Sequence, residues 1–280
     1  MDSSRLPAVV IPVHNAVDEL ARCLESVRST LPAEAEVIVI DDASTDPGVN
    51  GVLERCRREA GAGWTFRSNR QNLGFVATAN LGMRMAGGDV VLLNSDTEVT
   101  EGWLQGLQRC LASDPAIATA TPWTNNGEIA SLPRFCAANP VPPDREAVAA
   151  CLAAAGRPHY PELPTAVGFC MAIARRAIER VGLFDESRFG RGYGEENDFS
   201  MRVRNDGMRN VLCDDVYVVH LGGRSFGPLG LGPGEDSMRR LLSVHPGYLA
   251  LVEEFIAADP LAERRQSIIK ALERAAISLG

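Results

Sequence analysis

Residues 37–46 read VIVIDDASTD, four apolar residues followed by two aspartates and a turn-forming segment. The same order, an apolar run and then polar residues, occurs at residues 8–15 (AVVIPVHN) and 89–96 (DVVLLNSD). Between the first two runs, apolar residues recur at helical spacing over residues 17–30. Short apolar strands separated by helices are typical of α/β proteins. We therefore expect a mostly parallel central sheet flanked by helices.

The rest of the chain continues this alternation to residue 121 and then departs from it. Helices are predicted over about 52–60, 76–86 and 103–111, and strands over 64–67 and 117–121. Residues 122–145 are rich in Pro, Asn and Ala, which predicts a long loop. The later pattern predicts a strand at 166–174, a short helix, a glycine-rich segment at 190–194, a helix at 196–205 and strands at 210–213 and 216–220.

The C-terminal part is predicted to be a linker and a helical tail. Residues 227–234 (GPLGLGPG) have the composition of a flexible linker. We expect the amphipathic tail, 235–280, to fold back onto its own domain, with docking on a partner enzyme, a second subunit or a membrane surface as alternatives. The candidate buried positions of the tail are Leu241, Leu242, Leu249, Val252, Phe255 and Ile256.

Composition excludes several classes of function. The 280 residues are 45% hydrophobic, enough for one large or two small domains, and the net charge of −8 argues against a nucleic-acid partner. No apolar run approaches the roughly 18–20 residues of a membrane-spanning helix, and no signal peptide is recognisable at the N-terminus. We therefore expect a cytoplasmic location, with peripheral association at the inner face of the membrane left open.

Cysteine and lysine usage exclude further chemistry. The seven cysteines form no CxxC pair, so neither a zinc cluster nor a disulfide framework is expected. The single lysine, Lys270, lies near the C-terminus. A phosphate-binding loop of the Walker type needs a Gly-Lys pair that is absent, and a Schiff-base mechanism would depend on Lys270 alone.

Polar residues follow three of the predicted strands. Ligands of open α/β sheets bind beyond the carboxyl ends of parallel strands, so we expect one crevice there. Short carboxylate side chains suit a divalent cation and ribose or base hydrogen bonds, whereas the absence of GxGxxG argues against a dinucleotide. The alternative is that these aspartates only cap helices or turns. The residues concerned are Pro12, Val13, His14, Asn15, Asp41, Asp42, Asn94, Ser95 and Asp96.

A second acidic group, Glu195, Glu196 and Asp198, opens the helix that follows FGRGYG. Crowded carboxylates raise one another's pKa, which is useful in a general base. The alternative is stabilisation by the helix dipole alone. His220 ends the VYVVH strand, where it is either a neutral metal ligand or a structural histidine.

These clusters, in this order, resemble the family 2 inverting glycosyltransferases with the GT-A fold. The resemblance runs from about residue 9 to 226 and includes a branch that builds bacterial O-antigens and related surface polysaccharides, rhamnosyltransferases among them. It rests on VVIPVHN (9–15), VIVIDDASTD (37–46), NLGFVATANLGMRMAGGDVVLLNSDTEV (72–99), TPWTNN (121–126), GYGEENDFSMR (192–202) and VHLGGRSFG (219–227).

The resemblance implies a role for each matching residue. The donor, a UDP-, dTDP- or GDP-sugar, would bind through Pro12, Val13, His14, Asn15, Asp41 or Asp42, Asn72, Gly74, Asn80, Asn94 and Ser95. Asp96 would bind Mg²⁺ or Mn²⁺, completed by His220. Contacts to the acceptor or the donor sugar are implied for Trp123, Thr124, Asn125, Asn126 and Asp198.

The resemblance also implies an inverting mechanism. Glu196 aligns with the catalytic base that takes the proton from the acceptor hydroxyl, with Glu195 as its substitute. Two positions depart from the family pattern: Asn94 replaces the first aspartate of the DxD motif, which weakens metal binding, and Glu196 stands where aspartate is usual. The longer side chain is expected to shift the acceptor rather than abolish the reaction.

Other readings compete with a glycosyltransferase. Residues 223–227 match the GxSxG of serine hydrolases, but Pro228 follows where a helix is required. A sugar nucleotidyltransferase would typically need a basic, glycine-rich loop near the N-terminus, which is absent. A non-catalytic module that binds a nucleotide-sugar or glycan, or that scaffolds a partner enzyme, is kept open by Asn94.

The expected organisation has three parts. Residues 1–121 form the nucleotide-sugar half, 122–226 the acceptor and catalytic half, and 227–280 the linker and helical tail. The acceptor is expected to be a glycan or a lipid-linked molecule. The donor sugar, its base and the acceptor's identity do not follow from the sequence.

Overall fold

The computed structural model describes residues 5–222 and 235–280. The predicted linker at 227–234 and residues 223–226 of the VHLGGRSFG motif lie outside the described residues. The N-terminal half alternates strands and helices as predicted. Its elements are β1 (Ala8–Val13), α1 (Val17–Thr30), β2 (Val37–Asp41), α2 (Pro47–Glu59), β3 (Trp64–Ser68), α3 (Phe75–Met85) and β4 (Val90–Leu93).

The second half is less regular. It contains β5 (Thr97–Glu98), α4 (Trp103–Ser113), β6 (Ile117–Trp123), a 3-10 turn (Glu128–Ala130), α5 (Arg145–Ala154), β7 (Glu162–Leu163), β8 (Cys170–Ile173), α6 (Arg175–Val181), α7 (Glu186–Phe189), α8 (Glu195–Asn205), β9 (Arg209–Tyr217) and β10 (Val219–His220). The tail forms α9 (Glu235–Val244), α10 (Tyr248–Ala258) and α11 (Ala262–Arg274).

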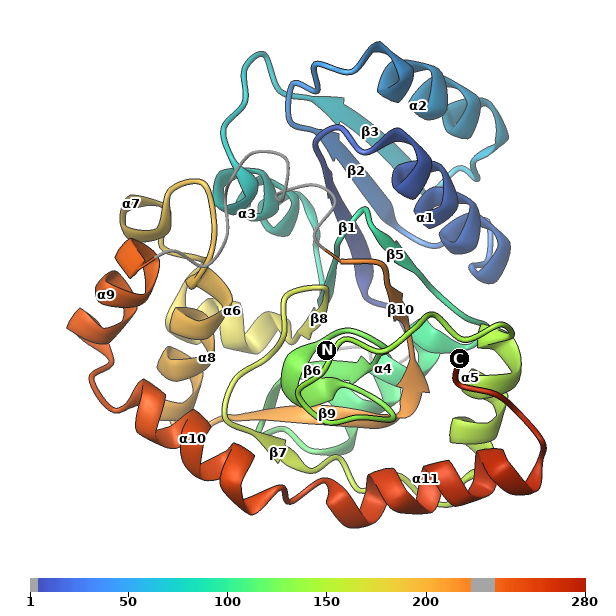
Figure 1. Cartoon of the computed structure of the whole chain (residues 1–280). Coiled ribbons are helices and arrows are strands. Elements are labelled where there is room, and N and C mark those ends of the chain that lie inside the picture. The colour runs from blue at the N-terminus through green and yellow to red at the C-terminus, as the bar shows by residue number, and fades with distance from the viewer. Residues whose placement is uncertain (1–4, 223–234) are drawn as a thin grey trace.

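Eight of the strands form one twisted sheet in the order β3-β2-β1-β4-β8-β6-β9-β7 (Figure 1). β1 to β4 are parallel, but β8 runs antiparallel to both β4 and β6, and β7 runs antiparallel to β9. β5 and β10 form a separate antiparallel pair. The sheet is therefore mixed, with its larger part parallel.

Both faces of the sheet are covered by helices. One apolar cluster packs α1, α2 and α4 against one face, and a second packs α3, α6, α8 and α9 against the other. β1 and β4 are apolar on both sides, and so is β2 up to Ile40, as expected for strands between two helical layers. A third cluster lies where α5 and α11 meet the end of β9.

Several boundaries differ from the prediction. α2 begins at Pro47 rather than residue 52, because Asp46 caps it by accepting from Gly48 N and proline fits the first helical turn. The predicted 166–174 strand is shorter, and the two predicted strands at 210–213 and 216–220 are one long strand followed by a short one. The loop after β6 ends at α5, a helix that the prediction lacks.

The tail folds back onto the domain, as predicted. α10 and α11 run along the outer edge past β7 and β9, and α11 reaches α5 (Figure 1). Leu241 is buried and Leu242, Val252 and Phe255 are half-buried. Leu249 and Ile256 were wrongly predicted as buried: they are 39% and 41% exposed because only one edge of α10 meets the domain.

Within the described residues, no single helix has both the length and the apolar composition to cross a membrane. α9 from Asp236 and α10 meet that test together by length and composition, but the chain bends by 100° between them.

Candidate active site at one edge of the sheet

The topology gathers distant segments at one edge of the sheet. The loops after β1, β2, β3 and β4 leave from the same edge because these strands are parallel and in register. β8 is antiparallel to β4, so the segment before it returns to this edge, where Asn94 N donates to Phe169 O (2.9 Å). The loop after β6 begins at this edge, and the β10 strand ends there. Segments from both halves of the chain therefore meet at the edge where the crevice was predicted.

The two neighbouring aspartates after β2 have different surroundings. Asp42 is buried, 4% exposed; its Oδ1 accepts from Asn69 Nδ2 (2.7 Å) and Leu73 N (2.8 Å), and its Oδ2 from Gly74 N (2.8 Å). Asp41 is half-buried, and among the described residues its carboxylate accepts only from the backbone N–H of Ser44 (3.1 Å). Asp42 thus fixes the loop 69–74, which leaves Asp41 as the aspartate available to a ligand.

The segment after β1 is held in an unusual backbone conformation. Asn15 and Ala16 have φ of 60° and 57°, and Ala43 opposite has 52°. Such left-handed non-glycine residues are strained and cluster at functional sites. Asn15 Oδ1 accepts from the backbone of Thr45 (2.9 Å) and Asp46 (3.0 Å), so its side chain ties the two loops together.

His14 lies on this edge within a group of amides. Its ring contacts Asn15 Nδ2 (3.2 Å), Asn72 Nδ2 (3.2 Å) and the Asp42 carbonyl (3.1 Å). His14 and Asn72 are half-buried, whereas Pro12 and Val13 are buried inside β1. The structure therefore brings His14 and Asn72 together at this edge and places Pro12 and Val13 within the sheet.

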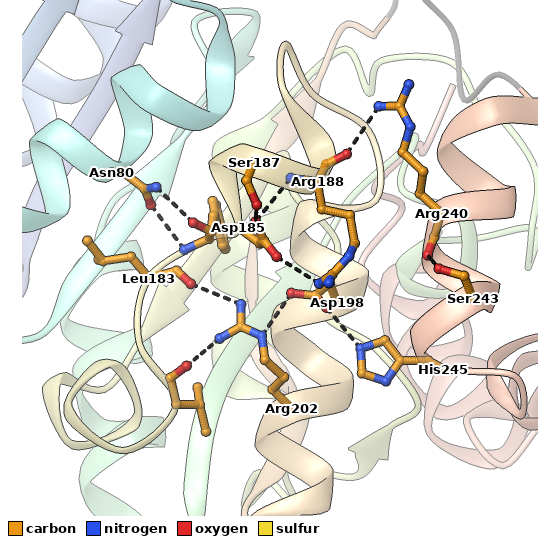
Figure 2. Close-up of polar contacts among 12 residues, drawn as sticks. Asn80, Leu183, Asp185, Ser187, Arg188, Asp198, Arg202, Arg240, Ser243 and His245 are labelled. Atoms are coloured by element: carbon orange, nitrogen blue, oxygen red, sulfur yellow. Dashed lines mark hydrogen bonds and ion pairs between the residues drawn. The ribbon is translucent and has the colours of Figure 1, made fainter.

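Asn80 and Gly74 connect α3 to the segment that contains Phe184 and Arg191. Asn80 is buried; its Nδ2 donates to Phe184 O (2.9 Å) and its Oδ1 accepts from Phe184 N (3.1 Å), as Figure 2 shows. Direct contact of Asn80 with a nucleotide is not compatible with this burial. Gly74 has φ of 87° and lies against Arg191, where an added Cβ would approach Arg191 Cα to 2.8 Å. The 190–194 segment therefore packs on the start of α3.

The predicted metal ligands face each other across the β5–β10 pair. Asp96 Oδ1 is 3.6 Å from His220 Nε2, and both side chains are largely buried. His220 Nδ1 donates to Asn126 O (2.6 Å) and the ring stacks on Phe169 at 5.2 Å. Burial acts to lower the pKa of His220, but the hydrogen bond and charge of Asp96 and the Asn126 carbonyl outweigh it, and the pKa is raised.

These residues fit a divalent cation that is shared with a ligand. A metal-binding histidine usually donates its other ring nitrogen to a carbonyl, as His220 does to Asn126. No group of three or more His, Cys, Asp and Glu side chains converges in the described part of the chain, so the protein would supply two ligands, Asp96 and His220. Mg²⁺ is commonly held in this way, by few side chains plus substrate phosphates. Asn94 contributes no charge.

Glu195 and Glu196 open α8 on the other side of this edge. The Oε2 atom of each is buried with no hydrogen-bond partner among the described residues. Burial raises the pKa of Glu195 well above its ordinary value, and the charge of Glu196 adds to this. Burial and the charge of Glu128 raise the pKa of Glu196. A carboxyl of raised pKa with an unpartnered oxygen is suited to accept a proton.

Tyr193 connects the two acidic groups. It precedes α8 in a left-handed conformation, φ 71°. Burial raises the pKa of Tyr193, and the charges of Glu195, Glu196 and Asp96 raise it further. The predicted base and the predicted metal ligand therefore lie within electrostatic reach of one side chain. Tyr193 was not predicted as a site residue and stood only within the GYGEEN motif.

The TPWTNN segment (121–126) forms hydrogen bonds with His220 through Asn125 and Asn126. Trp123, Thr124 and Asn125 are buried. The Asn125 side-chain amide makes two hydrogen bonds with the backbone of His220: its Nδ2 donates to the carbonyl (3.0 Å) and its Oδ1 accepts from the N–H (2.9 Å). Contact of these three side chains with a sugar is not compatible with their burial, whereas half-buried Asn126 remains at the edge.

Asp198 is also buried rather than exposed to a ligand. Its Oδ1 accepts from His245 Nε2 (2.9 Å) and its Oδ2 from Arg202 Nε (2.8 Å) (Figure 2). The predicted contact with an acceptor or sugar is therefore replaced by an internal ion pair. His245 belongs to the tail, and no local sequence signal joins it to Asp198.

Comparisons with known proteins identify a family and several similar proteins. The family model described as "Glycosyl transferase family 2" matches residues 8–182. A Drosophila melanogaster protein described as a putative polypeptide N-acetylgalactosaminyltransferase 13 is 34% identical over 125 residues, 40% of this chain and 22% of its own length. An uncharacterized protein of Mycobacterium tuberculosis is 27% identical over 158 residues, 54% of this chain and 55% of its own. The chain thus spans between about a fifth and about half of these relatives.

Solved structures share the fold at low sequence identity. GalNAc-T7, in a crystal structure with UDP, GalNAc and Mn²⁺, is 19% identical with a TM-score of 0.63, covering 98% of this chain and 57% of that one. Staphylococcus aureus TarS 1-349 with UDP-GlcNAc is 17% identical with a TM-score of 0.61, covering 95% and 79%. The mannosyltransferase PcManGT from Pyrobaculum calidifontis, with GDP-Man and Mn²⁺, is 17% identical with a TM-score of 0.56, covering 98% and 88%.

Proposed function

Because the chain belongs to glycosyl transferase family 2 and has the GT-A glycosyltransferase fold, we propose that it moves a sugar from a nucleoside-diphosphate sugar to an acceptor hydroxyl with inversion at the anomeric carbon. One observation supports this most directly. Two carboxylates of raised pKa, buried Glu195 and half-buried Glu196, open α8 at the sheet edge where Asp96 faces His220.

The donor half is proposed to be residues 1–121. Half-buried Asp41 and the His14–Asn72 group would bind the base and ribose, with Asp42 and Asn15 holding the two loops in place. UDP and GDP compounds occur in solved structures of the same fold, and dTDP is a further candidate. The acceptor half is proposed to be residues 122–226.

Glu196 is proposed to act as the general base. The acceptor oxygen attacks the anomeric carbon from the face opposite the diphosphate and forms the new C–O bond. The old anomeric C–O bond breaks, its electron pair leaves with the diphosphate, and the acceptor proton passes to the Glu196 carboxylate. A raised pKa makes the ionised carboxylate a stronger base near neutral pH.

Asp96 and His220 would hold Mg²⁺ or Mn²⁺, which neutralises charge on the departing diphosphate when it is bound. The neutral Asn94 leaves one anionic charge fewer beside the metal than the usual motif provides.

The order of the motifs supports a role in bacterial surface polysaccharide synthesis, with a glycan or a lipid-linked acceptor. We propose that this takes place in the cytoplasm or at the inner face of the membrane. dTDP-rhamnose is therefore included among the donors to be tested.

Calorimetric titration of UDP, dTDP and GDP, with and without Mn²⁺, tests the donor site. We expect one nucleotide to bind only with Mn²⁺ and Asp96→Ala to abolish this dependence. Absence of binding by all three at millimolar concentration, with Mn²⁺ present, would contradict the proposal.

Turnover separates the enzyme from a non-catalytic nucleotide-sugar module, the alternative that Asn94 keeps open. We expect the wild type to release nucleoside diphosphate from one donor of a panel of UDP-GlcNAc, UDP-GalNAc, GDP-mannose and dTDP-rhamnose. Glu196→Gln should lower that rate by about 10²- to 10⁴-fold while nucleotide affinity is kept. Glu254→Gln, at an exposed position of α10, is the control. Tight nucleotide binding without turnover would favour the module.

A further inference from the structure

The C-terminal tail anchors the helix that carries the proposed base. His245, in the turn between α9 and α10, donates to Asp198 in the first turn of α8 (2.9 Å), and both side chains are nearly inaccessible. Arg202 binds the other Asp198 oxygen and also donates to the carbonyls of Val181 and Leu183 (Figure 2). The buried hydrogen bond between His245 and Asp198 therefore fixes the tail against α8.

Tyr248, the first residue of α10, makes a second contact with α8, to the residue that follows the proposed base Glu196. Tyr248 OH donates to Asn197 Oδ1 (2.8 Å), and Thr165 Oγ1 lies 2.9 Å from the same oxygen. With Oδ1 held by two hydroxyl groups, the Asn197 amide directs Nδ2 to Glu196 Oε1 (3.3 Å). The reverse orientation would place Oδ1 against an ionised carboxylate, which is repulsive.

We propose that Tyr248 is a positioning residue for Glu196, acting through the Asn197 amide, and that His245 and Asp198 hold Tyr248 in the place where it does so. This inference rests on the proposed role of Glu196 as base. Asn197 occupies one carboxylate oxygen of Glu196 and leaves Oε2, which has no partner among the described residues, to accept a proton.

The contact also affects the acidity of Glu196. The titratable groups that interact with this carboxyl are Glu128 from the loop after β6, Glu195 on the same helix and the hydroxyl groups of Tyr193 and Tyr248. The backbone N–H groups of Gly194, Glu196 and Asn197 also interact with it and lower its pKa. The two glutamates favour its protonated form, whereas the Asn197 donor favours its ionised form. Releasing the Asn197 amide should therefore raise the pKa of Glu196.

The test compares Tyr248→Phe with a matched control. Tyr217 is another buried tyrosine, and its hydroxyl has no hydrogen-bond partner among the described residues, so Tyr217→Phe removes a hydroxyl without removing a contact. We expect Tyr248→Phe to lower kcat for nucleoside-diphosphate release by about 3- to 10-fold with the donor KM unchanged. The acid limb of its pH profile should move to higher pH. Tyr217→Phe should change neither.

Thr165→Val provides an internal check. Each hydroxyl alone can still hold the Asn197 oxygen, so the double variant with Tyr248→Phe should lose more activity than the product of the two single losses. ¹³C NMR titration of labelled glutamate, with Glu196 assigned from Glu196→Gln, measures the pKa of Glu196 without turnover. Tyr248→Phe should raise it.

The outcomes separate the two proposals. An inactive wild type with a Glu196 pKa that rises in Tyr248→Phe would overturn the proposed function and support the positioning contact. An active wild type whose kcat, pH profile and Glu196 pKa are all unaffected by Tyr248→Phe would overturn the positioning inference and leave the proposed function standing.

Discussion

Asp41 and Asp42 are adjacent, yet their surroundings give them separate tasks. Asp42 is buried with three hydrogen bonds to the loop 69–74, whereas Asp41 is half-buried with one. The division follows from alternation along the chain, because successive side chains at the end of a strand point to opposite sides. One therefore faces the neighbouring loop and the other is left for a ligand.

This division predicts opposite effects of two substitutions. Asp42→Ala should lower the free energy of unfolding by about 1–3 kcal/mol, because the backbone N–H groups of Leu73 and Gly74 lose their acceptor. Asp41→Asn should leave stability within about 0.5 kcal/mol and weaken nucleotide binding by about 10-fold or more. Urea unfolding and calorimetric titration measure the two effects. A stable Asp42→Ala variant with weakened binding would reverse the assignment.

Glu195 predicts a pH-dependent penalty on stability. Burial raises its pKa in the folded state, whereas the unfolded value is about 4.3. Above pH 4.3 the folded protein binds more protons at this group than the unfolded chain, so its contribution to stability falls as the pH rises towards the folded pKa. Glu195→Gln should therefore raise the free energy of unfolding at pH 8 and have a smaller effect at pH 4. Urea denaturation at both pH values checks this, and an equal effect at both would refute the burial argument.

At the scale of elements, close approach of helix and sheet depends on single glycines. Gly82 in α3 lies against β1, where an added Cβ would overlap the Val10 Cγ1 methyl group. Gly51 in α2 has no heavy atom within 4 Å of such a Cβ. Both glycines occupy helix interiors, so intrinsic helix propensity favours alanine at each.

The two positions should respond with opposite signs. Gly51→Ala should stabilise the protein by about 0.5–1 kcal/mol, whereas Gly82→Ala should destabilise it by about 1–3 kcal/mol because α3 must move off β1. Thermal and urea unfolding of the two variants give the comparison. A stabilised Gly82→Ala variant would mean that α3 is free to shift.

Elements with a strong local pattern are the ones that the sequence predicted well. β1 and α1 occur where they were predicted, because β1 is a continuous apolar run and the apolar residues of α1 recur at helical spacing. The start of α2 was missed although Asp46 and Pro47 signal it, and α5 was missed because its alanine-rich residues have a weak apolar period. The antiparallel direction of β8 depends on long-range pairing, which no local signal encodes.

The same limit applies to the candidate site. Residue types at strand ends indicated Asp96 and His220, and those at the start of a helix indicated Glu195 and Glu196; the fold brings both pairs to one edge of the sheet, within electrostatic reach of Tyr193. They did not distinguish side chains that face a ligand from those that hold a loop. Asn80, Asn125 and Asp198 belong to the second kind, as their burial and internal hydrogen bonds show. The contact of Tyr248 with Asn197 joins residues 51 positions apart.

At the scale of the whole molecule, the tail contributes to the same folded unit as the sheet. The family match ends at residue 182, yet Leu241 and Tyr248 join the apolar cluster under α3 and α8, and Leu261 and Ile268 join the cluster under α5. A tail that only rested on the surface would leave such side chains exposed. We therefore expect the described domain and tail to unfold together.

Two isoleucines test this. Ile268 in α11 is fully buried, whereas Ile256 in α10 is 41% exposed. Replacing each with alanine therefore compares the same truncation at a buried and at an exposed position of the tail. Ile268→Ala should lower the free energy of unfolding by about 2–5 kcal/mol and shift one urea transition, because the cavity lies in a core shared by tail and domain. Ile256→Ala should change it by less than about 0.5 kcal/mol. If Ile268→Ala instead produced two transitions, with tryptophan fluorescence unchanged in the first, the tail would be a separate unit. Its contacts with α8 would then stabilise the proposed base only while the tail is docked.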